Sequence, residues 1–247
     1  MFIQTYDSYV RFIAGDPLTM STTDTRDTRD TRVRLLDAAE GLFAGHGLDG
    51  TSLRAITSAA NVNLASVNYH FGSKEGLIGA VFHRRIEPLN HERFRLLDLA
   101  EQAATPEPPG LEDVLHAFLA PPLRLRASSD PGGMHFACLM GRVFAEPNEV
   151  KMQALSQFRP MAERFAEVLG RILPDLPQTE LLWRMHFLIG SLAHTIAAGD
   201  LICVLSSGTC DPDDVDGLLQ RLTTYAAAGF RAPVADPVSR KESNLTP

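Results

Sequence analysis

Residues 51–77, TSLRAITSAANVNLASVNYHFGSKEGL, constrain the fold of this chain more than any other segment. Thr51 is a candidate N-cap, and apolar residues follow it at helical spacing at Leu53, Ile56 and Ala60. Asn61 tolerates the left-handed backbone of a tight turn, and Asn63 can cap a second helix. The segment therefore predicts two short helices joined by a tight turn.

The second of these helices has one apolar face and one polar face. Val67 and Phe71 lie one turn apart and are expected to pack on the first helix. The opposite face carries small or hydrogen-bonding groups at Ala65, Ser66, Asn68 and Tyr69. Such a face suits a helix that enters the major groove of DNA and reads base edges. Ser73 then caps a third helix, whose first turn places Lys74 beside free N–H groups that attract phosphate.

The sequence VNLASVNYHFGSKEGL resembles the recognition-helix signature of TetR-family transcriptional regulators, and the similarity extends upstream through TRVRLLDAAEGLFAGHGLDGTSLRAIT. The resemblance implies a helix-turn-helix that binds double-stranded DNA, mostly through the phosphate backbone. It also implies seven contact positions, which are Thr51, Asn63, Ser66, Asn68, Tyr69, His70 and Lys74.

Three positions depart from the commoner TetR pattern. Asn61 replaces the usual glycine, Leu64 replaces a lysine or polar residue, and Gly72 replaces a frequent proline. Only Leu64 affects an expected contact, because leucine cannot bind phosphate. It either touches a thymine methyl group or packs inward.

Apolar residues recur at helical spacing along the rest of the chain, and no stretch has the period-2 alternation of a hairpin. Helices are expected at 31–44, 73–101, 111–125, 133–146, 148–173, 178–205 and 213–231. Pro88 predicts a kink or break in the second of these helices, and Pro160 a bend in the fifth. The predicted fold is all-α.

The chain divides into four expected parts. These are a disordered N-terminal extension at 1–30, a helix-turn-helix DNA-binding domain at 31–78, a larger ligand-binding and dimerisation domain at 79–232, and a flexible tail at 233–247. The extension ends in TDTRDTRDTR, whose alternating charges leave almost nothing to bury. Two interpretations stay open: translation starts at Met20 rather than Met1, or Arg26, Arg29 and Arg32 form an arm along a DNA groove.

The distribution of charge fits a DNA-binding region attached to an acidic body. The net charge is −7, yet the stretch from Asp24 to Arg95 holds ten basic and nine acidic residues, which leaves 13 basic and 21 acidic residues elsewhere. An acidic body opposes indiscriminate adhesion to DNA. No run approaches the roughly 18 to 20 apolar residues that a membrane-spanning helix needs, so no membrane partner and a cytoplasmic location are expected.

Metal and catalytic chemistry have little support in the sequence. The three cysteines form no C-x-x-C pair and are interpreted as buried thiols, and no two of the eight histidines have helical metal-pair spacing. DPDDVDG at 211–217 lacks the glycine and glutamate of an EF-hand, so its aspartates are assigned to the first turn of the final helix. No catalytic residue, metal or cofactor is expected, and a helical-bundle enzyme remains only as a rival hypothesis.

Methionine and aromatic residues are concentrated in the central helices, where they can line an adaptable cavity or fill an ordinary core. The candidate cavity residues are His116, Met134, His135, Met140, Arg142, Phe144, Phe165, Trp183 and His186. Arg142 and Glu146 are also spaced for an i,i+4 ion pair. The segments NLASVNYHFGSKEGL, RIEPLN and GRVFAEP resemble the PsrA-like subgroup, which implies a fatty acid or acyl-CoA as the small apolar effector.

Small residues lie beside apolar ones in the last two expected helices, notably at Ala193 and Ala227, and permit close helix packing. The TetR resemblance implies that these helices pair with their copies in a homodimer that binds a pseudopalindromic operator. The expected function is a repressor that a small apolar ligand releases from its operator. A constitutive regulator or an activator without ligand response is the alternative.

Overall fold

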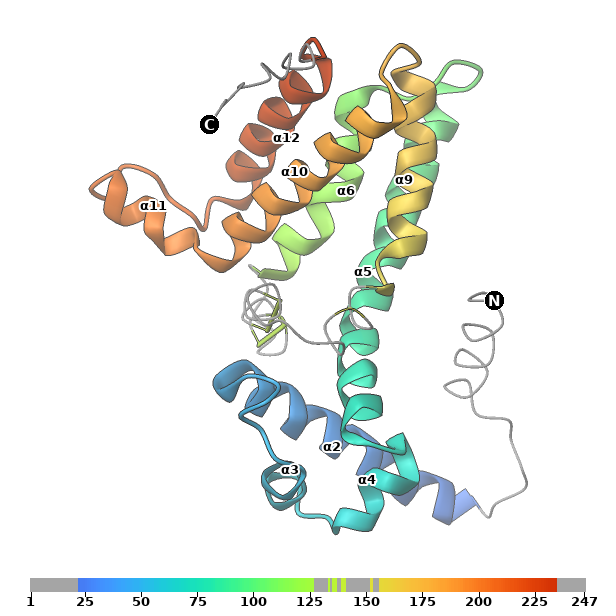
Figure 1. The fold of residues 1–247 in the computed structure, drawn as a ribbon, viewed down its shortest axis with the longest axis vertical. Helices are drawn as coiled ribbons and strands as arrows, with labels where there is room; N and C mark the ends of the chain where they lie inside the picture. Colours follow the sequence, from blue (N-terminus) through green and yellow to red (C-terminus); the bar gives the residue numbers. More distant parts are fainter. Residues whose placement is uncertain are drawn as a thin grey trace, which may run out of the picture.

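The computed structural model describes residues 22–126 and 156–234 and, between them, residues 133, 135, 136, 139, 140 and 152. Helices are the regular secondary structure of these ranges, which confirms the all-α prediction. The smaller part, the head, holds α2 (Thr22–His46), α3 (Leu53–Ala59) and α4 (Leu64–Phe71), and α5 (Lys74–Ala104) rises from it into the larger part (Figure 1). This larger part, the body, holds α6 (Leu111–Arg126), α9 (Arg159–Ile172), α10 (Gln178–Ala197), α11 (Gly199–Leu205) and α12 (Val215–Arg231).

Helix α2 begins at Thr22, so the prediction of disorder is wrong for residues 22–30. Acidic and basic residues alternate through this stretch, and opposite charges three or four residues apart support an exposed helix. Asp30 and Arg34 form such a pair, with 3.7 Å between carboxylate and guanidinium atoms. Residues 1–21 of the expected extension, and the expected tail from residue 235, lie outside the described residues.

The head and the body each have an apolar core. The head core combines residues such as Phe43 of α2, Ile56 of α3 and Val67 of α4 with the first half of α5. The body core combines α6, α9, α10 and α12 with the second half of α5, beginning at Leu97. Helix α5 is therefore a structural element of both parts.

Pro88 lies inside α5, and the helix continues through it without the break that the sequence allowed. The proline removes the N–H that would bond to the Arg84 carbonyl. Its ring is exposed to solvent, while Ile86 and Leu89 on either side are buried in the head core. Packing on both sides of the proline stabilises the helix at this point.

Two other expected helix shapes are wrong. Pro160 lies in the first turn of α9, where its missing N–H costs no helical bond, so it begins a helix rather than bending one. The expected helix at 178–205 is two helices, because Ala198 leaves helical geometry with φ −128° and ψ 30°, and α10 and α11 meet at 75°.

Two of the four aspartates at 211–217 lie at the start of α12, as expected, whereas Asp211 and Asp213 precede it. The Asp214 carboxylate accepts the Gly217 N–H at 3.0 Å and caps the helix, and Asp216 lies in its first turn. The expectation of buried thiols is wrong for Cys210, which is exposed, and Cys203 is half-buried. Cys138 lies outside the described residues.

Within the described ranges, no single helix is long and apolar enough to cross a membrane; by length and composition alone, the bent α10–α11 pair passes as a broken span.

Candidate DNA-binding surface and ligand cavity

The first helix of the helix-turn-helix, α3, is capped by Ser52 and not by Thr51. The Ser52 hydroxyl accepts the Ala55 N–H at 3.1 Å. Thr51 is 2% exposed, and its hydroxyl donates to the Gly47 carbonyl oxygen at 2.8 Å, with the Leu42 carbonyl oxygen at 3.2 Å. The N-cap prediction is thus wrong by one residue. Burial also removes Thr51 from the surface groups that can touch DNA in this conformation.

The turn between α3 and α4 is held from α2. Asn61 has the expected left-handed backbone, with φ 52°. Arg34 of α2 donates to the carbonyl oxygens of Ala60 and Asn61, at 3.1 and 2.7 Å, and so satisfies acceptors at the end of α3. The Asn63 side chain accepts the Ser66 N–H at 3.0 Å and caps α4 as predicted. These bonds fix the start of α4 relative to α2 and α3.

Helix α4 separates a buried face from an outward face. Val67 and Phe71 are buried in the head core, as their spacing predicted. Asn68 is exposed, and Tyr69 is 68% exposed. Leu64 is 44% exposed, which excludes inward packing and leaves the thymine-methyl contact open. Because residues four apart share a helical face, these exposed groups form one continuous outward surface.

His70 borders this surface and is half-buried. Its ring lies edge-on to Tyr69, with 5.0 Å between ring centroids. Burial, and then the positive charge of Arg32, lower the pKa of His70. The neutral imidazole is therefore favoured at neutral pH, so His70 can offer DNA a hydrogen bond but little positive charge.

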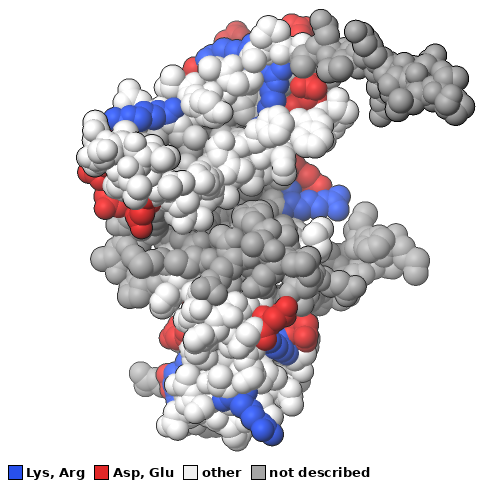
Figure 2. Space-filling model, turned by 60° about the vertical axis from the view of Figure 1, so that its left-hand side comes forward, with Lys and Arg blue, Asp and Glu red and all other residues white. Residues whose placement is uncertain are grey.

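Lys74 is placed by the junction between α4 and α5. Gly72 ends α4 with φ 74°, a conformation that a residue with a Cβ rarely adopts. The Ser73 hydroxyl then accepts the Gly76 N–H at 3.1 Å and caps α5. Lys74 follows in the first turn, where a lysine ammonium and free N–H groups can bind the same phosphate. Basic side chains are visible on the surface of the head, in the lower part of the view (Figure 2).

A buried carboxylate on α2 forms ion pairs with α5. These pairs were not predicted from the sequence. Glu40 of α2 is buried in the head. Its carboxylate accepts hydrogen bonds from Arg84 and, at 2.8 Å, from Arg85. Arg84 also donates to Asp37 at 2.6 Å. These ion pairs fix α2 on α5 one turn before Pro88, at the base of the connection to the body.

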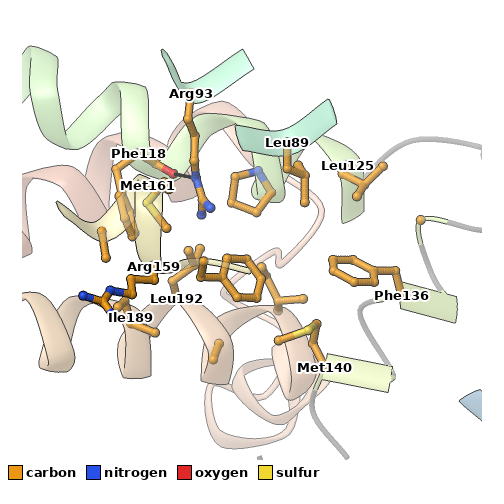
Figure 3. A pocket seen from close by; sticks show the side chains of 16 residues that line it. Leu89, Arg93, Phe118, Leu125, Phe136, Met140, Arg159, Met161, Ile189 and Leu192 are labelled. Atoms are coloured by element: carbon orange, nitrogen blue, oxygen red, sulfur yellow. Dashed lines mark hydrogen bonds between the residues drawn. The ribbon is translucent and has the colours of Figure 1, made fainter. Parts of the chain in front are cut away.

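A cavity of about 460 Å³ opens in the body beside the junction with the head. Both cores supply its walls, with Leu89 and Phe136 from the head core and Met161 and Leu192 from the body core (Figure 3). The lining is almost entirely apolar. Its size falls within the range of about 300 to 1,000 Å³ that is usual for small-molecule sites.

Sequence reasoning identified this cavity poorly. Among the described candidates, only Met140 lines it. The other described candidates do not line this cavity: Phe165 is buried against Phe118 in the body core, Trp183 and His186 are exposed on α10, His135 is exposed near Gly41, and His116 is half-buried. Residue type does not tell which side of a helix faces a void. Met134, Arg142 and Phe144, with the expected Arg142–Glu146 pair, lie outside the described residues.

Arg93 is the cavity residue that sequence reasoning missed. It is 4% exposed and extends from α5 to the cavity wall (Figure 3). Its Nε donates to the Phe118 carbonyl oxygen at 2.9 Å, and its guanidinium lies 4.5 Å from the centroid of the Phe118 ring. A signal was present, because Arg93 lies four residues from both Leu89 and Leu97 and so interrupts the buried apolar face of α5.

An aromatic contact links the cavity to the interior of the head core. Phe136 lines the cavity and packs edge-on against Phe82 of α5, with 6.4 Å between ring centroids. Phe82 is buried in the head core. Anything that displaces Phe136 therefore acts directly on the packing that supports the helix-turn-helix.

The outer face of α10 and α12 carries large exposed apolar side chains. Trp183 and Phe187 of α10 stack with 5.9 Å between ring centroids, and Tyr225 of α12 is also exposed. Two of the small residues expected at a dimer interface are elsewhere, since Ala227 is 2% exposed in the body core and Ala193 lines the cavity. Expectation and structure differ because a small residue packs closely on either side of a helix.

Comparisons with known families agree with this arrangement. The description "Bacterial regulatory proteins, tetR family" matches residues 35–81, and "Tetracyclin repressor-like, C-terminal domain" matches residues 116–229. Together the two matches span more than half of the chain. The chain belongs to the TetR family. It is a DNA-binding transcriptional regulator, and the PsrA-like subgroup has no separate support from these matches.

Solved structures of bacterial regulators share the fold at low sequence identity. The fatty acid degradation regulator FadR from Bacillus halodurans is 16% identical, with a TM-score of 0.56, and the match covers 82% of this chain and 97% of FadR. FadR from Bacillus subtilis in complex with stearoyl-CoA is 13% identical, with a TM-score of 0.56 and coverage of 80% and 98%. A TetR-family regulator from Bordetella parapertussis is 16% identical, with a TM-score of 0.56 and coverage of 83% and 98%. No curated protein sequence matches the chain.

Proposed function

We propose that this TetR-family chain is a homodimeric repressor that binds a pseudopalindromic operator and is released from it by a small apolar ligand. The position of the cavity carries the proposal, because its walls belong to both the head core and the body core. A ligand that fits one arrangement of head and body better than another shifts the population toward it. Release of DNA requires that the ligand-bound arrangement misplace the two heads.

The DNA contacts are assigned to the outward surface of α4 and the start of α5. Asn68 and Tyr69 are proposed to meet the major groove, and Lys74 a phosphate. The remaining contact candidates at the rim are Asn63, Ser66 and His70. Thr51 is assigned a supporting role, because its buried hydroxyl fixes the loop that leads into α3.

The dimer is assigned to the exposed apolar face of α10 and α12. Trp183, Phe187 and Tyr225 project from it, and a Cβ added at Gly190 or Gly229 would meet open space in the single chain. Figure 2 shows a broad area without charge on the part of the body that these helices occupy. We expect Phe187→Asp to be monomeric in light scattering, whereas Leu99→Asp, an exposed change on α5, stays dimeric. A wild-type monomer at micromolar concentration would contradict the assignment.

The class of effector is proposed to be a fatty acid or an acyl-CoA. The apolar lining suits a hydrocarbon chain, and the FadR structure from Bacillus subtilis was solved with stearoyl-CoA. The proposal places the protein in the cytoplasm, where bacterial operator DNA lies, and requires neither a cofactor nor a membrane partner. An operator affinity that no apolar ligand changes would favour the alternative of a constitutive regulator or activator.

Selection of bound sequences from random double-stranded DNA tests the DNA-binding part. The wild type should enrich a pseudopalindrome. Tyr69→Ala should weaken binding to that sequence while helicity and dimerisation persist, because the side chain is exposed. Lys74→Ala should weaken binding to all sequences and reduce the slope of log affinity against log salt by about 1. Unchanged DNA binding by both variants would show that α4 and the start of α5 do not form the DNA-binding surface.

A further inference from the structure

Arg93 is a charged side chain inside an otherwise apolar wall. It is buried, and burial lowers its pKa to about 10, so it remains protonated at neutral pH. Removing a cation from water costs several kcal/mol unless charge or hydrogen bonds compensate. A buried arginine at this position is therefore expected to have a negatively charged or hydrogen-bonding partner.

The protein compensates Arg93 only in part. A guanidinium has five N–H donors. The Phe118 carbonyl accepts one, and the Asn90 side-chain oxygen accepts another at 3.4 Å. Both acceptors are neutral, and the structure gives no carboxylate bonded to Arg93 among the described residues. Figure 3 shows the nitrogen atoms of Arg93 directed into the cavity, away from α5.

We propose that Arg93 binds the carboxylate of an amphipathic monocarboxylic acid whose hydrocarbon chain occupies the rest of the cavity. This inference rests on the proposed function, because it names the chemistry of the same effector site. The guanidinium is planar and its donors match the two oxygens of a carboxylate. The ligand would supply the negative charge that completes the hydrogen bonding of Arg93.

The cavity wall beyond Arg93 suits the hydrocarbon part of such an acid. From Arg93 the lining continues past Leu89 and Leu125 to Phe136 and Met140 (Figure 3). These side chains offer no charge. The far end of the chain would then contact Phe136, the residue that packs against Phe82 in the head core.

The charge count favours a free acid over a thioester. A thioester carbonyl is neutral and would leave the charge of Arg93 without a counter-ion, and the phosphates of an acyl-CoA are remote from the acyl group. The other arginine of the lining, Arg159, is 77% exposed and pairs with Glu163 at 2.7 Å, so it is already neutralised at the mouth. One buried cation matches one carboxylate.

The experiment compares three ligands of equal chain length on the full chain by isothermal titration calorimetry at pH 7.5: decanoate, 1-decanol and decanoyl-CoA. The wild type should bind decanoate most tightly. Arg93→Gln, which retains a hydrogen-bonding side chain, should weaken decanoate binding by at least about tenfold and change 1-decanol binding little. Arg95→Gln, the matched change at an exposed arginine of α5 outside the cavity lining, should leave the decanoate affinity within about twofold.

The outcomes separate the inference from the proposed function. If the wild type binds 1-decanol or decanoyl-CoA as tightly as decanoate, or Arg93→Gln weakens all three equally, the carboxylate anchor is wrong while the ligand site stands. If the wild type binds none of the three, both the site and the anchor are wrong. A circular dichroism melt of Arg93→Gln shows that the variant is folded, and Arg93→Lys, which keeps the charge, should restore part of the preference for decanoate.

Discussion

The head and the body of this regulator differ in how a buried charged side chain is neutralised. In the head, the Thr51 hydroxyl, the Arg34 guanidinium and the Glu40 carboxylate all bond to protein groups. In the body, a cavity of about 460 Å³ remains, and Arg93 on its wall has only neutral acceptors in the described structure. The ion pairs of the head hold α2 and α5 together, whereas the body retains a cavity and a buried charge that, in the proposed function, a ligand would complete.

The first prediction concerns a substitution that removes the buried ion pairs of the head. Glu40→Gln removes the buried charge that Arg84 and Arg85 share and should lower the free energy of unfolding by roughly 2–3 kcal/mol. Urea denaturation followed by circular dichroism measures the change. The matched control is Glu163→Gln, which breaks the exposed pair with Arg159 and should cost no more than about 1 kcal/mol. Equal effects of the two variants would show that the Glu40 ion pairs do not join α2 to α5.

The second prediction makes the same change in both regions. Ala39→Leu adds volume to the filled head core and should destabilise the protein by about 1–3 kcal/mol. Ala193→Leu adds the same volume beside the cavity and should leave the free energy of unfolding nearly unchanged, because space is available there. Thermal denaturation of both variants checks this. A larger loss for Ala193→Leu than for Ala39→Leu would mean that the cavity is closed in solution.

The third prediction concerns Pro88 in α5, the helix that connects the head to the body. Pro88→Ala restores an N–H donor in α5 and, because the site is exposed and already helical, should change stability by about 1 kcal/mol or less. The substitution should instead change the coupling between ligand binding and DNA binding. The variant should bind ligand with similar affinity, but the ratio of its operator affinities with and without ligand should differ from that of the wild type. An unchanged ratio would show that the signal does not depend on this proline.

The contrast between the regions also explains what the sequence could predict. Asn63, Val67 and Phe71 could be assigned because caps and helical spacing are local properties of the chain. Thr51 was misassigned because two adjacent hydroxyl residues can both cap, and only tertiary contacts show that Thr51 is buried.

The body was harder to predict because a cavity is a property of several helices together. Phe165 and Met140 are both apolar residues on helices, and only the packing shows that the first fills the core and the second faces the void. The helical spacing of Arg93 with Leu89 and Leu97 indicates burial, but only the packing of several helices shows the cavity beside it. The ion pairs of Glu40 joined residues more than forty positions apart, beyond the reach of a local pattern.

Operator affinity with the cavity empty, occupied and permanently filled tests the central claim most directly. The operator from the selection is titrated with wild type and with Ala193→Phe, each alone and with saturating decanoate, octadecanoate or stearoyl-CoA. The account predicts that one of these ligands weakens operator binding by the wild type by about 5- to 150-fold and that Ala193→Phe, still folded and dimeric, shows no ligand response. A wild-type affinity that none of the ligands changes, or a response that Ala193→Phe retains in full, would contradict the claim that this cavity controls DNA binding.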